Sequence, residues 1–140
     1  MAIQFLKRNF FQRLFGISAT AKPRHPDCWR YADRRITVDL AKAPELADAD
    51  GALRLEGGNL PVRVLVIADG NGEYHAFHNR CTHAGHRRMD PVPGTGTVQC
   101  CSVGKSTYDR AGKKIFGPTP DPISVYPVSK EDGYLIISIE

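Results

Sequence analysis

The sequence predicts a small all-β domain that follows an N-terminal helix, and three observations indicate this fold class. Short apolar or alternating runs recur from residue 29 onward, clusters of Gly, Asn and Asp separate them, and 140 residues suit one hydrophobic core. Hydrophobic residues make up 41% of the chain and charged residues 24%, which is typical of a globular protein. No apolar run approaches the ~20 residues of a membrane-spanning helix.

Residues 1–18 form the first predicted element, an amphipathic helix. Apolar side chains recur there at steps of three and four, at Ile3, Leu6, Phe10, Leu14 and Ile17. A basic, aromatic-rich helix of this kind suits the surface of an anionic membrane or a groove on a partner subunit. The alternatives are a helix folded back onto the domain and, less favoured because Arg13 interrupts the apolar region, a signal peptide.

Residues 19–28 are predicted to be a linker, since Pro23 and Pro26 oppose regular structure. The β pattern begins at Trp29. The expected strands share short apolar or alternating runs, at residues 36–40, 52–55, 62–68, 74–77, 97–100 and 134–139. Turns are expected where Gly, Asn and Asp gather, at residues 51, 57–59, 69–72 and 132–133. A short helix is possible at residues 43–49.

The positive charge of the chain comes from its N-terminal part. Five of the 19 basic residues lie within residues 1–24, which hold no acid, so the rest carries 14 basic against 15 acidic residues. A nucleic-acid-binding body would show a basic cluster, and apart from Arg87-Arg88 and Lys113-Lys114 the sequence shows none. Nucleic-acid binding is therefore not expected.

The residues that suggest chemistry lie between Arg80 and Asp109. Cys81 and His83 are separated by one residue, so a tight turn can point both at one site. Cys100 and Cys101 follow nineteen and twenty residues after Cys81. Thiolate and imidazole together are ligands for iron or zinc, and four cysteines are too few for a secreted disulfide scaffold of this length. Metal binding in a reducing compartment is therefore the better interpretation.

The two segments together resemble the Rieske family, which has C-x-H in one loop and C-x-x-H-G-x-x-[FY]-D in another. Matching on Tyr108-Asp109 places Cys101 on the second cysteine ligand. The residues around Tyr74–Phe77, Gly117-Pro118 and Gly133–Ile137 also resemble the strand before the first loop, the proline loop and the closing strands. The resemblance covers roughly residues 29–140. It implies a Rieske-like antiparallel β sandwich or barrel with an inserted cluster-binding subdomain, whose loops span about 79–90 and 100–109.

In that family each loop gives one Cys to one iron and one His to the other. The resemblance therefore implies Cys81, His83 and Cys101 as ligands of a [2Fe-2S] cluster. It also implies that Ser106 and Tyr108 form hydrogen bonds to the cluster sulfurs and so tune the reduction potential. Gly85 would help to shield the cluster, and Lys105 would lie at its edge.

The second histidine ligand of the family is missing, since Gly104 occupies its position and Lys105 that of the following glycine. Three alternatives follow. His86 or Cys100 completes the coordination, although adjacent residues on an extended chain point to opposite sides and disfavour Cys100 together with Cys101. Otherwise the iron keeps an exchangeable ligand, or the fold has lost its cluster.

The function we expect is one-electron transfer, as a small ferredoxin or an accessory subunit of a redox complex, with no bond chemistry of its own. The expected partners are redox proteins. The expected location is cytoplasmic, with residues 1–18 docking on a membrane surface or a partner subunit. The alternatives are a cluster-free interaction subunit and a protein with a single Fe or Zn ion.

Overall fold

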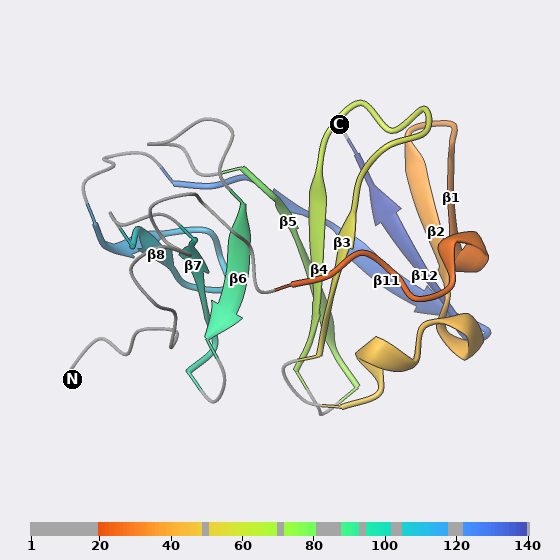
Figure 1. Ribbon diagram of the computed structural model, residues 1–140, viewed down its shortest axis with the longest axis horizontal. Coiled ribbons are helices and arrows are strands. Elements are labelled where there is room, and N and C mark those ends of the chain that lie inside the picture. Colours follow the sequence, from red (N-terminus) through yellow and green to blue (C-terminus); the bar gives the residue numbers. More distant parts are fainter. Residues whose placement is uncertain are drawn as a thin grey trace.

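The computed structural model describes residues 20–48, 51–69, 72–80, 88–92, 95–101, 105–117 and 122–139. Within these ranges the chain forms twelve short strands in three antiparallel sheets of four strands each (Figure 1). The all-β prediction is confirmed. The predicted helix at residues 1–18 lies outside the described residues.

The first sheet, here called the terminal sheet, holds both ends of the β domain. Its order is β1 (Trp29–Ala32), β2 (Arg35–Asp39), β12 (Tyr134–Ser138) and β11 (Val128–Glu131). Alternate residues of β2 and β12 are buried, so one face of this sheet covers a core and the other meets solvent.

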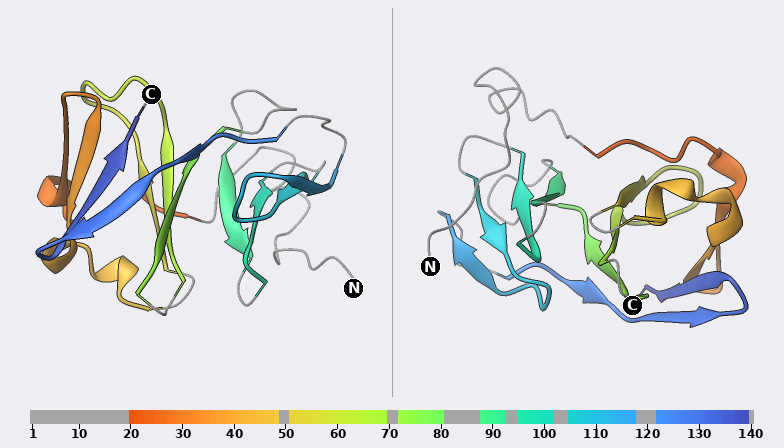
Figure 2. Two further views of the ribbon diagram at one scale, coloured as in Figure 1. Left: turned by 180° about the vertical axis from the view of Figure 1, so that it is seen from behind. Right: turned by 90° about the horizontal axis from the view of Figure 1, so that it is seen from below.

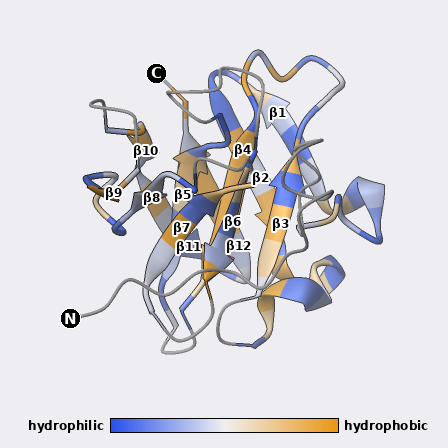
Figure 3. Cartoon of the chain, turned by 60° about the vertical axis from the view of Figure 1, so that its left-hand side comes forward, coloured by the Kyte–Doolittle hydropathy of each residue, from blue (hydrophilic) through white to orange (hydrophobic). Residues whose placement is uncertain are grey.

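The central sheet lies between the other two (Figures 1 and 2). Its order is β10 (Val125–Tyr126), β5 (Tyr74–His78), β4 (Val64–Ala68) and β3 (Ala52–Leu55). Every residue of β4 is buried, and this strand is apolar along its length (Figure 3). Val64 and Val66 face the core shared with the terminal sheet, whereas Leu65 and Ile67 face a second core. A strand covered on both sides explains this continuous apolar run.

The third sheet, here called the loop sheet, packs on the second core. Its order is β6 (Met89–Val92), β7 (Thr97–Cys100), β8 (Thr107–Tyr108) and β9 (Lys114–Phe116). The two predicted cluster loops fall at the ends of these strands, one between β5 and β6 and the other between β7 and β8. The described ends of both loops therefore lie on the side of the central sheet that faces away from the terminal sheet.

The short helical stretch expected around residues 43–49 is a single 3-10 turn at Pro44–Leu46, and another precedes it at Leu40–Lys42. A new 3-10 turn starts at Pro44, and the preceding one therefore ends at Lys42. A third lies at Pro26–Cys28, within the predicted linker. Among the described residues no helix is both long and apolar enough to cross a membrane.

Candidate metal centre

Cys101 lies directly after β7 and is 2% exposed. Its amide donates a hydrogen bond of 3.0 Å to the carbonyl of Arg88, the residue just before β6. This bond joins the end of the first loop to the start of the second. The other predicted ligands, Cys81, His83 and His86, and the predicted shielding residue Gly85 lie outside the described residues.

Asn79 closes the first loop at its base. Its amide donates to the carbonyl of Arg63 at 2.8 Å, and its side-chain Oδ1 accepts from the amide of Met89 at 2.6 Å. The side chain is fully buried. One residue thus ties the end of β5 to the start of β6 and fixes the span that the segment carrying Cys81 and His83 must bridge.

Cys100 points away from the loops. Its side chain is buried in the second core, which also contains Phe77, Met89 and Tyr108. Its amide donates to the carbonyl of Ser106 at 2.7 Å and so closes the base of the second loop. Cys101 is not part of this core, in keeping with the alternation of side chains along an extended chain.

Ser106 carries a buried hydroxyl that has no hydrogen-bond partner among the described residues. The residue is 1% exposed and packs tightly on Gly117, whose φ is +111°. A Cβ at position 117 would come within 2.5 Å of the Ser106 Cα and 2.8 Å of its Oγ. Because an unpaired buried hydroxyl is costly, it points to an acceptor that belongs to a bound group.

Tyr108 and Lys105 complete the described part of the second loop. Tyr108 is fully buried in the second core and pairs with Val98 of β7. Lys105 has a φ of +53°, in the left-handed region, and its carbonyl accepts from the Thr107 hydroxyl at 2.9 Å. This turn leads directly into Ser106.

Charged side chains that sequence reasoning missed surround Cys101. Arg88 binds Glu56 through two hydrogen bonds of 3.0 and 2.8 Å, and the Nε of Arg54 lies 3.0 Å from the same carboxylate. Burial alone would raise the pKa of Glu56, but Arg88, Arg54 and Lys22 outweigh it and hold that pKa below its usual value. Arg88 is 32 residues from Glu56 in the sequence, so no local pattern could have predicted this pair.

The described histidines of the central sheet have partners of their own. His78 packs against the Tyr126 ring, with the ring centroids 6.4 Å apart, and burial together with Arg80 and Arg63 lowers its pKa. The Nε2 of His75 lies 3.1 Å from the Asp69 carboxylate. Glu73 lies close to both, but the guanidinium of Arg110 lies 3.6 Å from Asp69 and supplies the positive charge there.

Cys28 is a core residue. It is almost fully buried, and burial with the nearby Glu45 and Asp27 raises the pKa of its thiol to about 11. A thiol held in its protonated form is a poor metal ligand.

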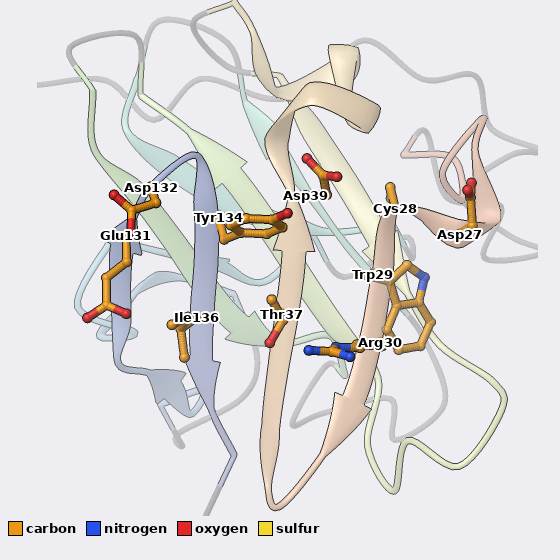
Figure 4. Close-up of a pocket in the computed structure, with 10 residues that line it drawn as sticks. All are labelled: Asp27, Cys28, Trp29, Arg30, Thr37, Asp39, Glu131, Asp132, Tyr134 and Ile136. Carbon is orange, nitrogen blue, oxygen red and sulfur yellow. The ribbon is translucent and has the colours of Figure 1, made fainter.

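A shallow hollow of about 570 Å³ lies on the outer face of the terminal sheet (Figure 4). Four carboxylates and one arginine are among its lining residues, namely Asp27, Asp39, Glu131, Asp132 and Arg30. The Tyr134 ring lies between Asp39 and Asp132, and Tyr134 pairs with Asp39 across the strands. None of the predicted ligands lines this hollow.

Comparison with known proteins agrees with this geometry. The family model of the Rieske [2Fe-2S] domain matches residues 37–127. The 3-phenylpropionate/cinnamic acid dioxygenase ferredoxin subunit of Shigella flexneri is 32% identical over 78 residues, which cover 54% of this chain and 73% of that protein. The glycine betaine monooxygenase oxygenase subunit of Pseudomonas aeruginosa is 37% identical over 67 residues, which cover 48% of this chain and 15% of that protein.

Two solved structures show the same fold. The ferredoxin of carbazole 1,9a-dioxygenase from Nocardioides aromaticivorans aligns with a TM-score of 0.60 and 19% identity, over 74% of this chain and 98% of its own. A plasma membrane Rieske protein from Synechocystis aligns with a TM-score of 0.52 and 24% identity, over 63% and 86%. At these identities the likeness concerns the fold alone.

Proposed function

The chain belongs to the Rieske [2Fe-2S] domain family, and from that premise we propose that it transfers single electrons between partner proteins by means of a [2Fe-2S] cluster. The observation that carries the proposal is that Cys101 and the unpartnered Ser106 hydroxyl are both buried in the second loop, whose start is hydrogen-bonded to Arg88 at the end of the first. The ferredoxin subunits among the relatives support the same function.

The described residues fit such a cluster. Cys101 would bind one iron together with Cys81, and His83 would bind the other iron. When bound, the group supplies one reversible electron, at a potential set by its ligands and by nearby hydrogen bonds. Ser106 would donate its hydroxyl proton to a cluster sulfur, which gives the hydroxyl the acceptor it otherwise lacks. Gly117 packs closely against Ser106 and so limits the positions that its side chain can adopt.

For the fourth ligand we propose His86. Gly104 takes the usual histidine position, and Cys100 is packed into the second core. The described histidines of the central sheet are engaged elsewhere, His78 with Tyr126 and His75 with Asp69. An exchangeable ligand in place of His86 is the competing possibility, and it would leave one iron open to small molecules.

The partners we propose are the reductase and the terminal component of an oxygenase system, because relatives are named as ferredoxin and oxygenase subunits of such enzymes. The docking of residues 1–18 on a membrane or a partner subunit stays a prediction.

Visible and electron paramagnetic resonance spectra of cysteine variants purified without oxygen test the proposal. Cys101→Ser should abolish the cluster, because a serine oxygen is a poor substitute for a thiolate ligand of iron. The matched controls Cys100→Ala and Cys28→Ser should keep the wild-type spectrum, since both thiols lie in hydrophobic cores. His86→Ala should keep iron but shift the spectrum.

Three results would contradict the proposal. An unchanged spectrum in Cys101→Ser would remove this residue from the ligand set. Metal without acid-labile sulfide in the wild-type protein would indicate a single Fe or Zn ion. Wild-type protein without metal would indicate an interaction subunit.

A further inference from the structure

The ends of both loops are surrounded by positive side chains. Backbone hydrogen bonds hold Arg63 and Arg88 at the ends of the loops. The Arg63 carbonyl accepts from the Asn79 amide, and the Arg88 carbonyl accepts from the Cys101 amide. Arg80 follows Asn79 directly and is exposed, and Lys105 precedes Ser106. With Arg54 and Lys22, which are within electrostatic reach of Glu56, these residues form what we call the basic collar.

Two carboxylates of the described residues lie near the collar, and both bind groups of this chain. Glu56 binds Arg88 and Arg54. Asp90 is buried and accepts a hydrogen bond of 2.8 Å from the amide of Thr20. Among the described residues, the six cations of the collar outnumber these two carboxylates.

An apolar edge adjoins the collar. Ile115 and Phe116 on the edge strand β9 are 41% and 39% exposed. Phe116 pairs with Thr107, the residue after Ser106, and the next residue, Gly117, packs on Ser106 itself. Exposed apolar side chains with charged residues around them have the composition of a protein interface.

The hollow on the terminal sheet differs in charge from the collar. It has four carboxylates and one arginine among its lining residues, and Lys42 is paired with Asp27 there at 3.1 Å. The central sheet separates the terminal sheet from the loop sheet (Figure 1). The hollow is therefore an acidic patch on the side of the molecule away from the collar.

We propose that the basic collar and the Ile115–Phe116 edge form the docking surface for an acidic face of a redox partner protein. This rests on the proposed function and adds to it the charge of the partner and the side on which it binds. The positive side chains of the collar would attract an acidic partner to the loops, whereas the carboxylates of the hollow would repel it, which raises the rate of productive encounter. On docking, one electron leaves the reduced cluster and one enters the partner's oxidised centre.

Nucleic acid is the less suitable occupant of this surface. Binding of single strands uses exposed aromatic side chains between cations along a groove. The arginines Arg54 and Arg88 are instead bound to Glu56, and Phe116 is the one large aromatic side chain exposed near the collar among the described residues.

The test uses the full chain with its cluster, reduced with dithionite and mixed with an oxidant in a stopped-flow instrument. The oxidants are hexacyanoferrate(III), an anion, and tris(phenanthroline)cobalt(III), a cation. Each accepts one electron from the cluster. Rates are compared at ionic strengths of about 0.01 M and about 1 M, where the Debye length is about 30 Å and about 3 Å. The anion should react about tenfold more slowly at high salt, and the cation should not be slowed.

Charge-reversal variants locate the effect. Arg80→Glu and Lys22→Glu should each slow oxidation by the anion severalfold at low salt, and Lys22 is not adjacent to any proposed ligand. Arg30→Glu makes the same charge change at the hollow and should leave the rate within roughly twofold of wild type, since the site is on the far side of the sandwich. Broadening of amide NMR signals by hexacyanochromate(III), an anion that accepts no electron, should be strongest around Lys22 and Phe116.

The possible results distinguish a failure of the proposed function from a failure of the docking surface. Protein without a cluster spectrum would overturn the proposed function and this inference with it. Loaded protein that reacts with both oxidants independently of salt, or Arg30→Glu with the same effect as Lys22→Glu, would overturn the docking surface alone. Tighter binding of a single-stranded DNA oligomer than of an aspartate-rich peptide of equal charge would also overturn it.

Discussion

Among the single residues, Ser106 is the one whose proposed effect on the reduction potential is easiest to measure. Its hydroxyl is buried and lacks a hydrogen-bond partner among the described residues, and the packing of Gly117 leaves the side chain little room to turn. A hydrogen bond to a cluster sulfur is strongest when the cluster is reduced, because the reduced form carries one more negative charge. The hydrogen bond that we propose from Ser106 would therefore favour reduction.

We expect Ser106→Ala to lower the reduction potential of the loaded protein by about 60 mV, the equivalent of losing a hydrogen bond worth about 1.4 kcal/mol. Redox titration followed by visible absorption measures this change. Ser129→Ala, an exposed position on β11, is the matched control and should keep the wild-type potential. Equal potentials in the two variants would show that Ser106 does not bind the cluster.

The motif around Tyr108-Asp109 predicted Cys101, Ser106 and Tyr108 as members of one site. All three are buried, and their role at a cluster stays a prediction. The clamp made by Asn79 and the pair of Arg88 with Glu56 could not be predicted, because each depends on contacts between segments that are distant in sequence.

At the scale of elements, the pair of Glu56 and Arg88 joins the central sheet to the loop sheet. Glu56 follows β3 and Arg88 precedes β6, and the carboxylate side chain is only 10% exposed. A two-bond pair with this burial fixes how the two sheets meet at the base of the first loop.

We expect Glu56→Gln to lower the free energy of unfolding by about 2 kcal/mol at neutral pH, since charge-assisted hydrogen bonds are lost. The folded pKa of Glu56 lies below its unfolded value. Its stabilisation is therefore complete above an unfolded pKa of about 4.3 and disappears as the pH falls through the folded pKa. Urea unfolding at several pH values measures the difference, which should vanish in acid.

Glu131→Gln, an exposed carboxylate on β11, is the control for this comparison. It should change the stability little at any pH, because exposed charges contribute little. A difference between wild type and Glu56→Gln that stays constant down to strongly acidic pH would contradict the assigned ion pair.

Local patterns explain which elements could be predicted. The strands at residues 52–55 and 97–100 were predicted with their observed bounds, and the Asp132-Gly133 turn joins β11 to β12 with both residues at positive φ. The turn at Asp33-Arg34 has the same backbone signs but no glycine, so the sequence did not reveal it. The strands β8 and β10 have two residues each, too few to show a period.

In the molecule as a whole, the layering of the three sheets places the acidic hollow and the basic collar on different sides. The central sheet has a core on each side, so the terminal sheet and the loop sheet face opposite directions. The apolar run at residues 62–68 predicted a strand, but the sequence did not show that both of its faces would be covered or what would cover them. The near-neutral composition likewise concealed an acidic hollow at one end and a basic collar at the other.

We propose that two loops of this protein enclose a [2Fe-2S] cluster held by Cys101 and ligands from the first loop. The experiment is low-temperature electron paramagnetic resonance of the dithionite-reduced wild-type protein, purified without oxygen, together with a count of iron and acid-labile sulfide. We expect a signal from one unpaired electron shared by two irons, with equal iron and sulfide. A silent spectrum, or metal without sulfide, would refute the cluster.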